Sequence, residues 1–295
     1  MNASQLCVLL VACTTLACGS NANTAPAGED GGPSSGAESS GAAETSSGEQ
    51  TPDPETGPDS GPEPKPKFDT GAASPTVCAG DPQVVTFATA DGVTLEADFV
   101  PSGQATGKSA VLLHMIPPSN DRSNYPDSFI GALTGAGYSV LNVDRRGAGG
   151  SGGDATAAYE GPAGKEDALA AVAWLGESDC ALDASEVVLA GASNGTTTAL
   201  DYTIASKTPP RALVFLSPGA YTENQNTVAE HSALLSGLPV FLGYPDSERR
   251  WPEAVRGVAG EGWVLRQYDG GSHGSRLFTS SKTVSADILG FLAGL

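Results

Sequence analysis

The residues best suited to chemistry lie in the segment Gly191-Ala192-Ser193-Asn194-Gly195, whose central serine carries a hydroxyl nucleophile. The run before it, Val187 to Ala190, is apolar and branched, which predicts a strand buried on both faces. A helix-like stretch, Thr196 to Ala205, follows at once. A serine at such a sharp turn is strained, so the residues two before and two after it must lack bulky side chains. Backbone N–H groups at the start of the helix favour developing negative charge, so the pattern indicates a nucleophile that attacks a carbonyl.

The segment Gly191 to Gly195 resembles the nucleophile elbow of the α/β-hydrolase family. A Gly-x-Ser-x-Gly string also occurs in ordinary strand-to-helix turns, so the surrounding residues must discriminate between the two. The family orders its catalytic triad as Ser, acid, His along the chain. Of the three histidines, His114 precedes the serine and His231 lies before the last two expected strands. Only His273, flanked by glycines, follows the final strand. The resemblance therefore implies His273 as the general base, the alternative being a surface loop histidine.

The acid of the triad is expected after the strand Pro239 to Leu242, where the segment Gly243 to Glu248 supplies two carboxylates. Asp246 has the better distance from the strand end and is the expected acid. Glu248 is the alternative. Asp269 lies too close to His273 in sequence and is interpreted as a turn residue.

The loop His114-Met115-Ile116 follows another buried strand, Ser109 to His114, and resembles the family's His-Gly-x loop. The resemblance implies two backbone N–H donors to the oxyanion, from Asn194 and from Ile116, with Met115 as the alternative to Ile116. Met115 stands where the family has glycine, so the loop shape is expected to differ. His114 is expected to orient the loop rather than to transfer protons.

The elements around these residues alternate between strands and helices after an opening hairpin at Asp91-Gly92. This order predicts an α/β protein with the α/β-hydrolase fold: a mostly parallel sheet with helices on both faces and an opening antiparallel hairpin. Only the segment Pro218 to Leu238 separates two late strands, so no large cap domain is expected. The expected strands are Val84 to Thr89, Thr94 to Val100, Ser109 to His114, Tyr138 to Asp144, Val187 to Ala190, Ala212 to Leu216, Pro239 to Leu242 and Trp263 to Tyr268; the expected helices are Ser128 to Ala136, Lys165 to Leu175, Thr196 to Ala205 and Thr283 to Leu292.

A second glycine-rich motif, Asp144 to Gly152, contains a literal Gly-x-Gly-x-x-Gly and invites a dinucleotide-binding interpretation. No helix is expected to open at these glycines, and Arg145 and Arg146 occupy the turn where close packing would be needed. The motif resembles instead the Asp-x-Arg-Gly loop that follows this strand in α/β-hydrolases. No cofactor is expected.

The N-terminal residues have the pattern of an export signal followed by a tether. Residues 1–18 contain a short apolar run and two lipobox-like segments, which resemble those of bacterial lipoproteins and place the lipid on Cys18 or, alternatively, Cys13. A plain cleaved signal peptide is the alternative, because residues 1–5 contain no Lys or Arg. Residues 19–75 are rich in Gly, Ser, Pro and acidic residues and predict a disordered tether. Residues 76–295 are expected to form the α/β-hydrolase domain. The expected location is the bacterial cell envelope, at the periplasmic face or the cell surface.

The cysteines and the net charge indicate which disulfide, metal site and partners to expect. Cys78 and Cys180 are an even pair in the folded part, and in an oxidising compartment they predict a disulfide; two unrelated thiols are the alternative. The chain has no C-x-x-C pair and no His cluster, so no metal site is expected. A formal net charge of −19 without a basic patch argues against a nucleic-acid partner.

Three functions are compatible with these residues. The favoured hypothesis is a membrane-tethered serine hydrolase that cleaves small carboxylic esters, with a small-molecule ester and the lipid bilayer as its partners. An amidase or peptidase with the same triad is the second hypothesis, since the nucleophilic chemistry is shared. A non-catalytic surface binding protein on a hydrolase scaffold is the third.

Overall fold

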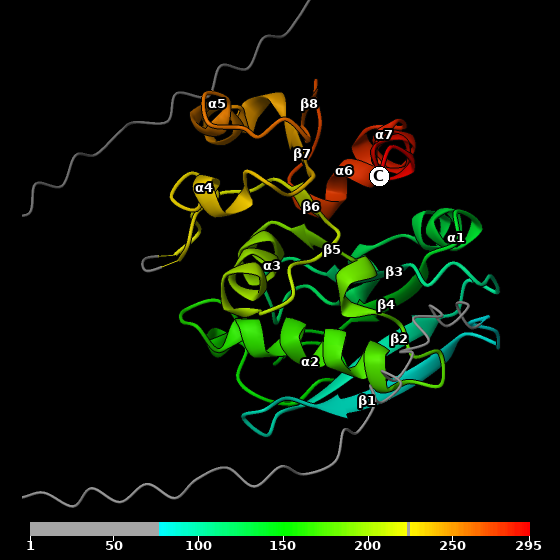
Figure 1. Ribbon diagram of the computed structural model, residues 1–295. Coiled ribbons are helices and arrows are strands. Elements are labelled where there is room, and N and C mark those ends of the chain that lie inside the picture. Colours follow the sequence, from blue (N-terminus) through cyan, green and yellow to red (C-terminus); the bar gives the residue numbers. More distant parts are fainter. Residues whose placement is uncertain (1–76, 223–224) are drawn as a thin grey trace, which may run out of the picture. The chain divides into compact units, whose positions relative to one another are not determined.

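The computed structural model describes residues 77–222 and 225–295, which form an eight-stranded sheet with strand order β1-β2-β4-β3-β5-β6-β7-β8 (Figure 1). The predicted signal segment (1–18) and tether (19–75) lie outside the described residues. The strands are β1 (Gln83–Ala88), β2 (Thr94–Val100), β3 (Ser109–Leu113), β4 (Ser139–Val143), β5 (Val187–Ala192), β6 (Ala212–Leu216), β7 (Val240–Pro245) and β8 (Trp263–Tyr268).

The sheet is antiparallel at one edge and parallel elsewhere. Strand β2 pairs antiparallel with β1 and with β4, and every later pairing, from β3–β4 to β7–β8, is parallel. All residues of the central strands β3, β4, β5 and β6 are buried, because helices cover both faces of the sheet there. The opening hairpin and the mostly parallel sheet are as the sequence predicts.

Helices form a layer on each face of the sheet (Figure 1). One core cluster joins α2 and α3 to one face of the sheet, through Leu175 and Leu200 among others. A second cluster joins α1 and α7 to the opposite face, through Phe129 and Ile288. The helices are α1 (Asp127–Gly135), α2 (Gly164–Glu177), α3 (Asn194–Ala205), α4 (Ser232–Leu235), α5 (Arg250–Val255), α6 (Leu277–Ser280) and α7 (Val284–Ala293).

The connection from β6 to β7 is short. Its described residues contain only the single-turn helix α4, so they build no large cap over the carboxyl ends of the strands. This agrees with the sequence-based expectation. Within residues 77–222 and 225–295, no helix has the length and apolar character needed to cross a bilayer.

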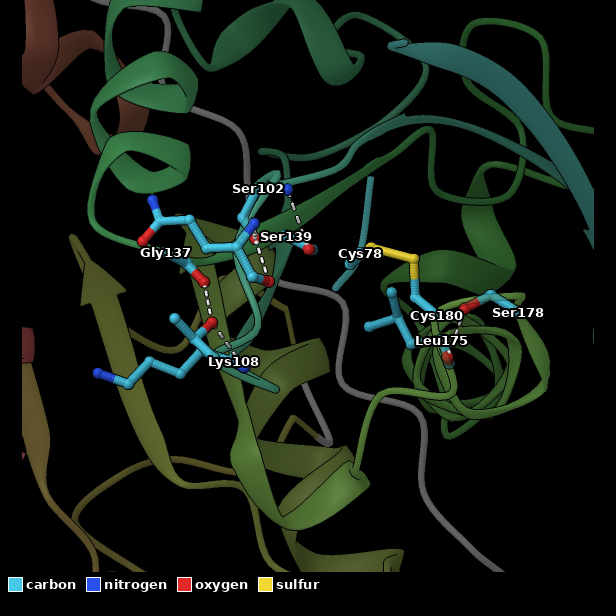
Figure 2. The surroundings of a disulfide bond; sticks show 10 residues. Cys78, Ser102, Lys108, Gly137, Ser139, Leu175, Ser178 and Cys180 are labelled. Carbon is cyan, nitrogen blue, oxygen red and sulfur yellow. Dashed lines mark hydrogen bonds between the residues drawn. A yellow bond between two sulfur atoms is a disulfide. The ribbon is translucent and has the colours of Figure 1, made fainter. Parts of the chain in front are cut away.

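A disulfide joins Cys78 to Cys180 across the start of the domain (Figure 2). Cys78 is buried just before β1, and Cys180 lies in the loop that leaves α2 toward β5. In that loop the Ser178 hydroxyl donates to the Leu175 carbonyl at 2.7 Å, which closes the end of α2 beside the bridge. The pairing that the sequence predicts is present.

Candidate active site

Ser193 lies at a sharp turn between β5 and α3. Its backbone has φ 52° and ψ −125°, in a region that residues other than glycine rarely occupy. The Ser193 N–H donates to the Leu216 carbonyl of the neighbouring strand β6 at 2.8 Å, which holds the strained turn in place. The turn therefore presents the hydroxyl at the carboxyl edge of the sheet, directly before the first N–H groups of α3.

The two glycines that flank this turn are required by close backbone contacts. A Cβ on Gly191 would lie 2.3 Å from the Gly195 carbonyl oxygen, and a Cβ on Gly195 would lie 2.2 Å from the Leu113 carbonyl oxygen. Any side chain at either position would push the helix away from the ends of β3 and β5. The spacing Gly-x-Ser-x-Gly thus has a steric cause in this fold.

His273 lies within hydrogen-bond distance of the serine. Its Nε2 is 2.7 Å from Ser193 Oγ, although the two residues are far apart in sequence. The loop after β8 brings the imidazole there, and Gly274 makes the approach possible with φ 61°. A Cβ on Gly274 would be strained at this φ and would meet the Met115 sulfur at 2.6 Å, which favours glycine beside the imidazole. The Gly274 N–H donates to Ser217 Oγ at 2.8 Å, which fixes the loop to the end of β6.

Glu248, and not Asp246, is the carboxylate that contacts His273. Glu248 Oε1 lies 2.6 Å from His273 Nδ1. The expectation for Asp246 fails because β7 continues to Pro245 rather than ending at Leu242, which leaves Asp246 at the strand end with an exposed side chain. A 3-10 turn over Asp246–Glu248 then directs Glu248 toward the imidazole. Asp246 accepts instead from the Gly270 N–H at 3.1 Å and so shapes the loop that carries the histidine.

The environment of Glu248 favours its charged form. Partial burial alone would raise the pKa of Glu248, but hydrogen bonds to His273 and Ser217 outweigh it and hold the pKa below the usual range of a glutamate. The carboxylate therefore accepts the Nδ1 proton of His273, which leaves the Nε2 lone pair free to accept the Ser193 hydroxyl proton. The tautomer that a general base needs is set by this contact.

Tyr221 covers the site from the segment after β6. Its ring contacts the His273 imidazole edge-on with centroids 5.8 Å apart, and its hydroxyl donates to the Ser217 carbonyl. Burial and the nearby Glu248 carboxylate raise the pKa of the tyrosine, so it stays neutral. Ser193 itself is only 4% exposed. The neutral Tyr221 side chain therefore adds no charge beside the buried nucleophile.

The loop after β3 packs directly against the nucleophile turn. A Cβ added to Gly195 would lie only 2.6 Å from the His114 carbonyl oxygen. His114 Nδ1 bonds to the Met115 carbonyl at 2.7 Å, and its Nε2 accepts the Arg145 N–H at 2.9 Å. Burial, helped by the Arg145 charge, lowers the pKa of His114 to about 3. At neutral pH the imidazole is therefore uncharged, and hydrogen bonds at both ring nitrogens hold the loop in place.

The expected oxyanion donors lie in the two segments that meet at Gly195. Asn194 is the first residue of α3, where N–H groups have no partner within the helix. Ile116 and Met115 lie in the adjoining loop after β3. Their roles as donors stay predictions.

The structure also brings residues to the site that sequence reasoning did not single out, notably Ser217 and Arg145. Ser217 follows β6 directly, and its position at the carboxyl end of a parallel strand was a usable signal. Arg145 was noted only as an obstacle to a dinucleotide site, and nothing in its spacing indicated that it would be buried under the nucleophile turn.

The glycine-rich segment 144–152 forms turns and opens no helix, since the next α-helix begins only at Gly164. The Gly147 N–H donates to the Gly152 carbonyl at 2.8 Å, closing the loop on itself. Asp144 accepts from the backbone of Arg122 and from the Gly150 N–H, both at 2.8 Å. These bonds hold the loop in its turn conformation. In the described part of the chain, no group of three His, Cys, Asp or Glu side chains is arranged to hold a metal ion.

The family model described as X-Pro dipeptidyl-peptidase (S15 family) matches residues 91–239, a range that includes Ser193 and ends before Glu248 and His273. A search of curated proteins found no similar sequence.

Solved structures with similar folds are α/β hydrolases. An esterase of Pyrococcus furiosus has a TM-score of 0.59 at 20% identity, over 72% of this chain and 90% of that one. A serine hydrolase of Xanthomonas campestris, described as lacking a lid, has a TM-score of 0.53 at 16% identity, over 74% of this chain and 96% of that one. An α/β hydrolase of Novosphingobium aromaticivorans has a TM-score of 0.56 at 12% identity, over 74% of this chain and 100% of that one. At these identities the likeness concerns the fold, which is the α/β-hydrolase fold that the sequence predicts.

Proposed function

The chain belongs to the X-Pro dipeptidyl-peptidase (S15) family, and from that premise we propose that it is an exported serine hydrolase that cleaves small, uncharged carboxylic esters. One observation carries the proposal: the hydrogen-bonded chain from Ser193 Oγ through the His273 imidazole to the Glu248 carboxylate, with contacts of 2.7 and 2.6 Å. A nucleophile, a base and an orienting acid in this order are what acyl transfer needs.

The reaction uses these groups in two half-reactions. In the first, Ser193 Oγ attacks the ester carbonyl while His273 Nε2 takes the hydroxyl proton, and Glu248 stabilises the resulting imidazolium. The tetrahedral intermediate collapses as His273 protonates the departing alkoxide, which leaves an acyl group on Ser193. In the second, His273 removes a proton from water, the water attacks the acyl carbonyl, and the acid leaves as Ser193 regains its proton. Backbone N–H groups of Asn194 and Ile116 would hold the oxyanion in both steps, each worth about 10²–10³-fold.

Two uncharged side chains beside Ser193 support an uncharged substrate. Met115 and Tyr221 lie against the site, and the nearby carboxylate, Glu248, is engaged by His273.

Cleavage of an N-terminal dipeptide is the second candidate, and the family description is the observation that favours it. Such a substrate presents an ammonium group close to the scissile carbonyl, and a free carboxylate there would bind it. Because Glu248 is bound to His273, we favour the ester. A panel that compares p-nitrophenyl esters with an X-Pro p-nitroanilide separates the two candidates by their kcat/KM values.

The test of the proposal is hydrolysis of p-nitrophenyl acetate and butyrate by the full chain, beside the variants Ser193→Ala and His273→Ala. We expect each variant to lose at least about 10³-fold in kcat while keeping the wild-type melting temperature. Labelling by a fluorophosphonate should occur in the wild type and be absent in Ser193→Ala. An inert wild type that also refuses the label would favour the third hypothesis, a non-catalytic binding protein.

Export and lipid anchoring are part of the same proposal. The disulfide between Cys78 and Cys180 supports an oxidising compartment, since such bonds persist mainly outside the cytosol. Lipid on Cys18, or on Cys13, would hold the domain at the cell envelope. Growth of a bacterial host with an alkyne-bearing fatty acid should label the wild type and fail to label one of Cys18→Ser and Cys13→Ser. A plain cleaved signal peptide would leave every form unlabelled.

A further inference from the structure

Arg145 is a buried cation without an ionic partner. Its side chain is completely buried, and no carboxylate of the described residues lies within ion-pair distance of it. Its neighbour Arg146 differs, because its guanidinium pairs with Asp167 and Asp91, each at 2.7 Å. Burial lowers the pKa of Arg145 only to about 10, so the group stays charged at neutral pH. Removing such a charge from water is energetically costly, which calls for a role beyond packing.

The acceptors of Arg145 lie in the two segments expected to form the oxyanion hole. Its guanidinium donates to the carbonyl of His114 at 3.2 Å and to that of Met115 at 3.4 Å. It also donates to the side-chain oxygen of Asn194 at 2.8 Å. The nitrogen that donates to Asn194 also donates to the Ala158 carbonyl at 2.8 Å and to the Thr198 hydroxyl at 2.7 Å.

The backbone carbonyls of His114 and Met115 belong to the same peptide groups as the expected N–H donors. The His114 carbonyl shares a peptide group with the Met115 N–H, and the Met115 carbonyl shares one with the Ile116 N–H. In a trans peptide the carbonyl and the N–H point in opposite directions. The cation that holds the carbonyls therefore turns the N–H groups away from itself. Whichever of Met115 and Ile116 donates to the oxyanion, Arg145 holds the other end of that peptide group.

A charge at the carbonyl also makes the N–H a stronger donor. Hydrogen bonds polarise one another along a chain, and a buried cation acts with little screening. Asn194, which would supply the remaining donor from its backbone, is fixed by the same guanidinium through its side chain. One group thus reaches both halves of the expected anion site without lying at its surface.

We propose that Arg145 is the positioning residue of the oxyanion hole, orienting and polarising the peptide groups of Met115 and Ile116 and fixing Asn194 without touching the substrate. The proposal rests on the serine-hydrolase function proposed above. The two adjacent arginines then have different roles: Arg145 positions the donors to the developing oxyanion, and Arg146 stabilises the fold.

The test compares Arg145→Met and Arg145→Lys with Arg146→Lys, all in the full chain, using p-nitrophenyl butyrate. We expect Arg145→Met to lower kcat about 10–100-fold with KM changed less than about threefold, because the anion forms only after binding. Arg145→Lys should recover part of the loss by restoring the charge without the full set of bonds. Arg146→Lys should melt earlier and keep the wild-type kcat.

A second measurement distinguishes positioning from a structural role. Butylboronic acid bonds to Ser193 Oγ as the serine proton moves to His273, which leaves a tetrahedral boron with a negative charge. The inhibition constant should rise in Arg145→Met by about the factor by which kcat falls. A structural defect would instead reduce the number of titratable sites and leave the inhibition constant of the remaining sites unchanged.

The outcomes separate this inference from the proposed function. An active wild type with kcat and boronate affinity unchanged in folded Arg145→Met overturns the inference alone. Should Arg145→Met fail to fold, a folded Arg145→Lys with wild-type kcat overturns it equally. A wild type that hydrolyses no ester and takes no fluorophosphonate overturns the proposed function, and this inference falls with it.

Discussion

Two carboxylates follow β7, and the backbone there decides which one can act on the histidine. Glu248 reaches His273 Nδ1, whereas Asp246 bonds to the Gly270 N–H. The first contact sets the tautomer and stabilises the imidazolium, and the second only shapes a loop. The two residues are therefore a matched pair for mutation.

We expect Glu248→Gln to lower kcat/KM for p-nitrophenyl butyrate by about 10²–10⁴-fold. The glutamine amide can hold the His273 imidazole in the wrong tautomer, and it cannot stabilise the charge of the imidazolium. Asp246→Asn, at an exposed position, should change it by less than about threefold. Steady-state kinetics at neutral pH measures both. Equal losses in the two variants would assign the acid to neither residue, and a larger loss in Asp246→Asn would reverse the assignment.

His114 makes the stability of the domain depend on pH in a defined window. Its pKa is about 3 in the folded state and 6.5 as the reference value of histidine. Between these values the unfolded chain binds a proton that the folded chain refuses, so the free energy of unfolding falls as pH falls. The contribution is complete above about pH 6.5 and is lost progressively toward pH 3.

As pH falls across this window, we expect the free energy of unfolding of the wild type to decrease by up to about 1.4 kcal/mol per pH unit more than that of His114→Gln. Glutamine suits the comparison, since it can accept the Arg145 N–H and donate to the Met115 carbonyl without titrating. Urea unfolding at several pH values supplies the slopes. Parallel curves for the two proteins would show that His114 contributes no proton linkage.

At the scale of elements, the site depends on three segments that meet within van der Waals distance: the end of β3, the turn after β5 and the loop after β8. Gly195 and Gly274 are the points of contact, because a Cβ on either glycine would overlap an atom of another residue. Gly131 offers a contrast, because it lies inside α1 with nothing within 4 Å of its Cβ position.

We expect Gly195→Ala to abolish most ester hydrolysis and to destabilise the domain by at least about 2 kcal/mol, since the backbone of β3 cannot move aside. Gly131→Ala should leave activity unchanged and stabilise α1 by up to about 1 kcal/mol. Thermal unfolding and kcat of the two variants check this. An active Gly195→Ala would mean that the turn does not need the close approach seen here.

For the whole domain, the disulfide ties the chain before β1 to the loop before β5, a sequence separation of 102 residues. A bridge over so long a loop mainly restricts the unfolded chain, and typical bridges contribute about 2–4 kcal/mol. It also secures the strand that carries the nucleophile, since the linked loop leads into β5.

We expect the double variant Cys78→Ser/Cys180→Ser to unfold at lower denaturant, with about 2–4 kcal/mol less free energy of unfolding. Dithiothreitol should weaken the wild type by a similar amount and leave the double variant unchanged. Guanidinium titrations with and without reductant measure the effect. Identical midpoints for oxidised and reduced wild type would contradict it.

What the sequence by itself determined is local in character or depends on composition. Runs of branched apolar residues predicted the buried strands, glycine spacing predicted the turn at Ser193, and the even cysteine pair predicted the disulfide. His273 could be singled out because it was the only histidine after the last strand. Each of these depends on residue type and order, which the sequence states directly.

Only the tertiary structure decided between Glu248 and Asp246 and revealed Arg145. The first depends on where β7 ends and how the next turn is wound, and pairing with β8 extends that strand to Pro245. The second depends on burial, which for a charged side chain no local pattern indicates. Arg145 is held by acceptors from the loop after β3, from α3 and from the segment before α2, and such a set exists only once those elements have packed together.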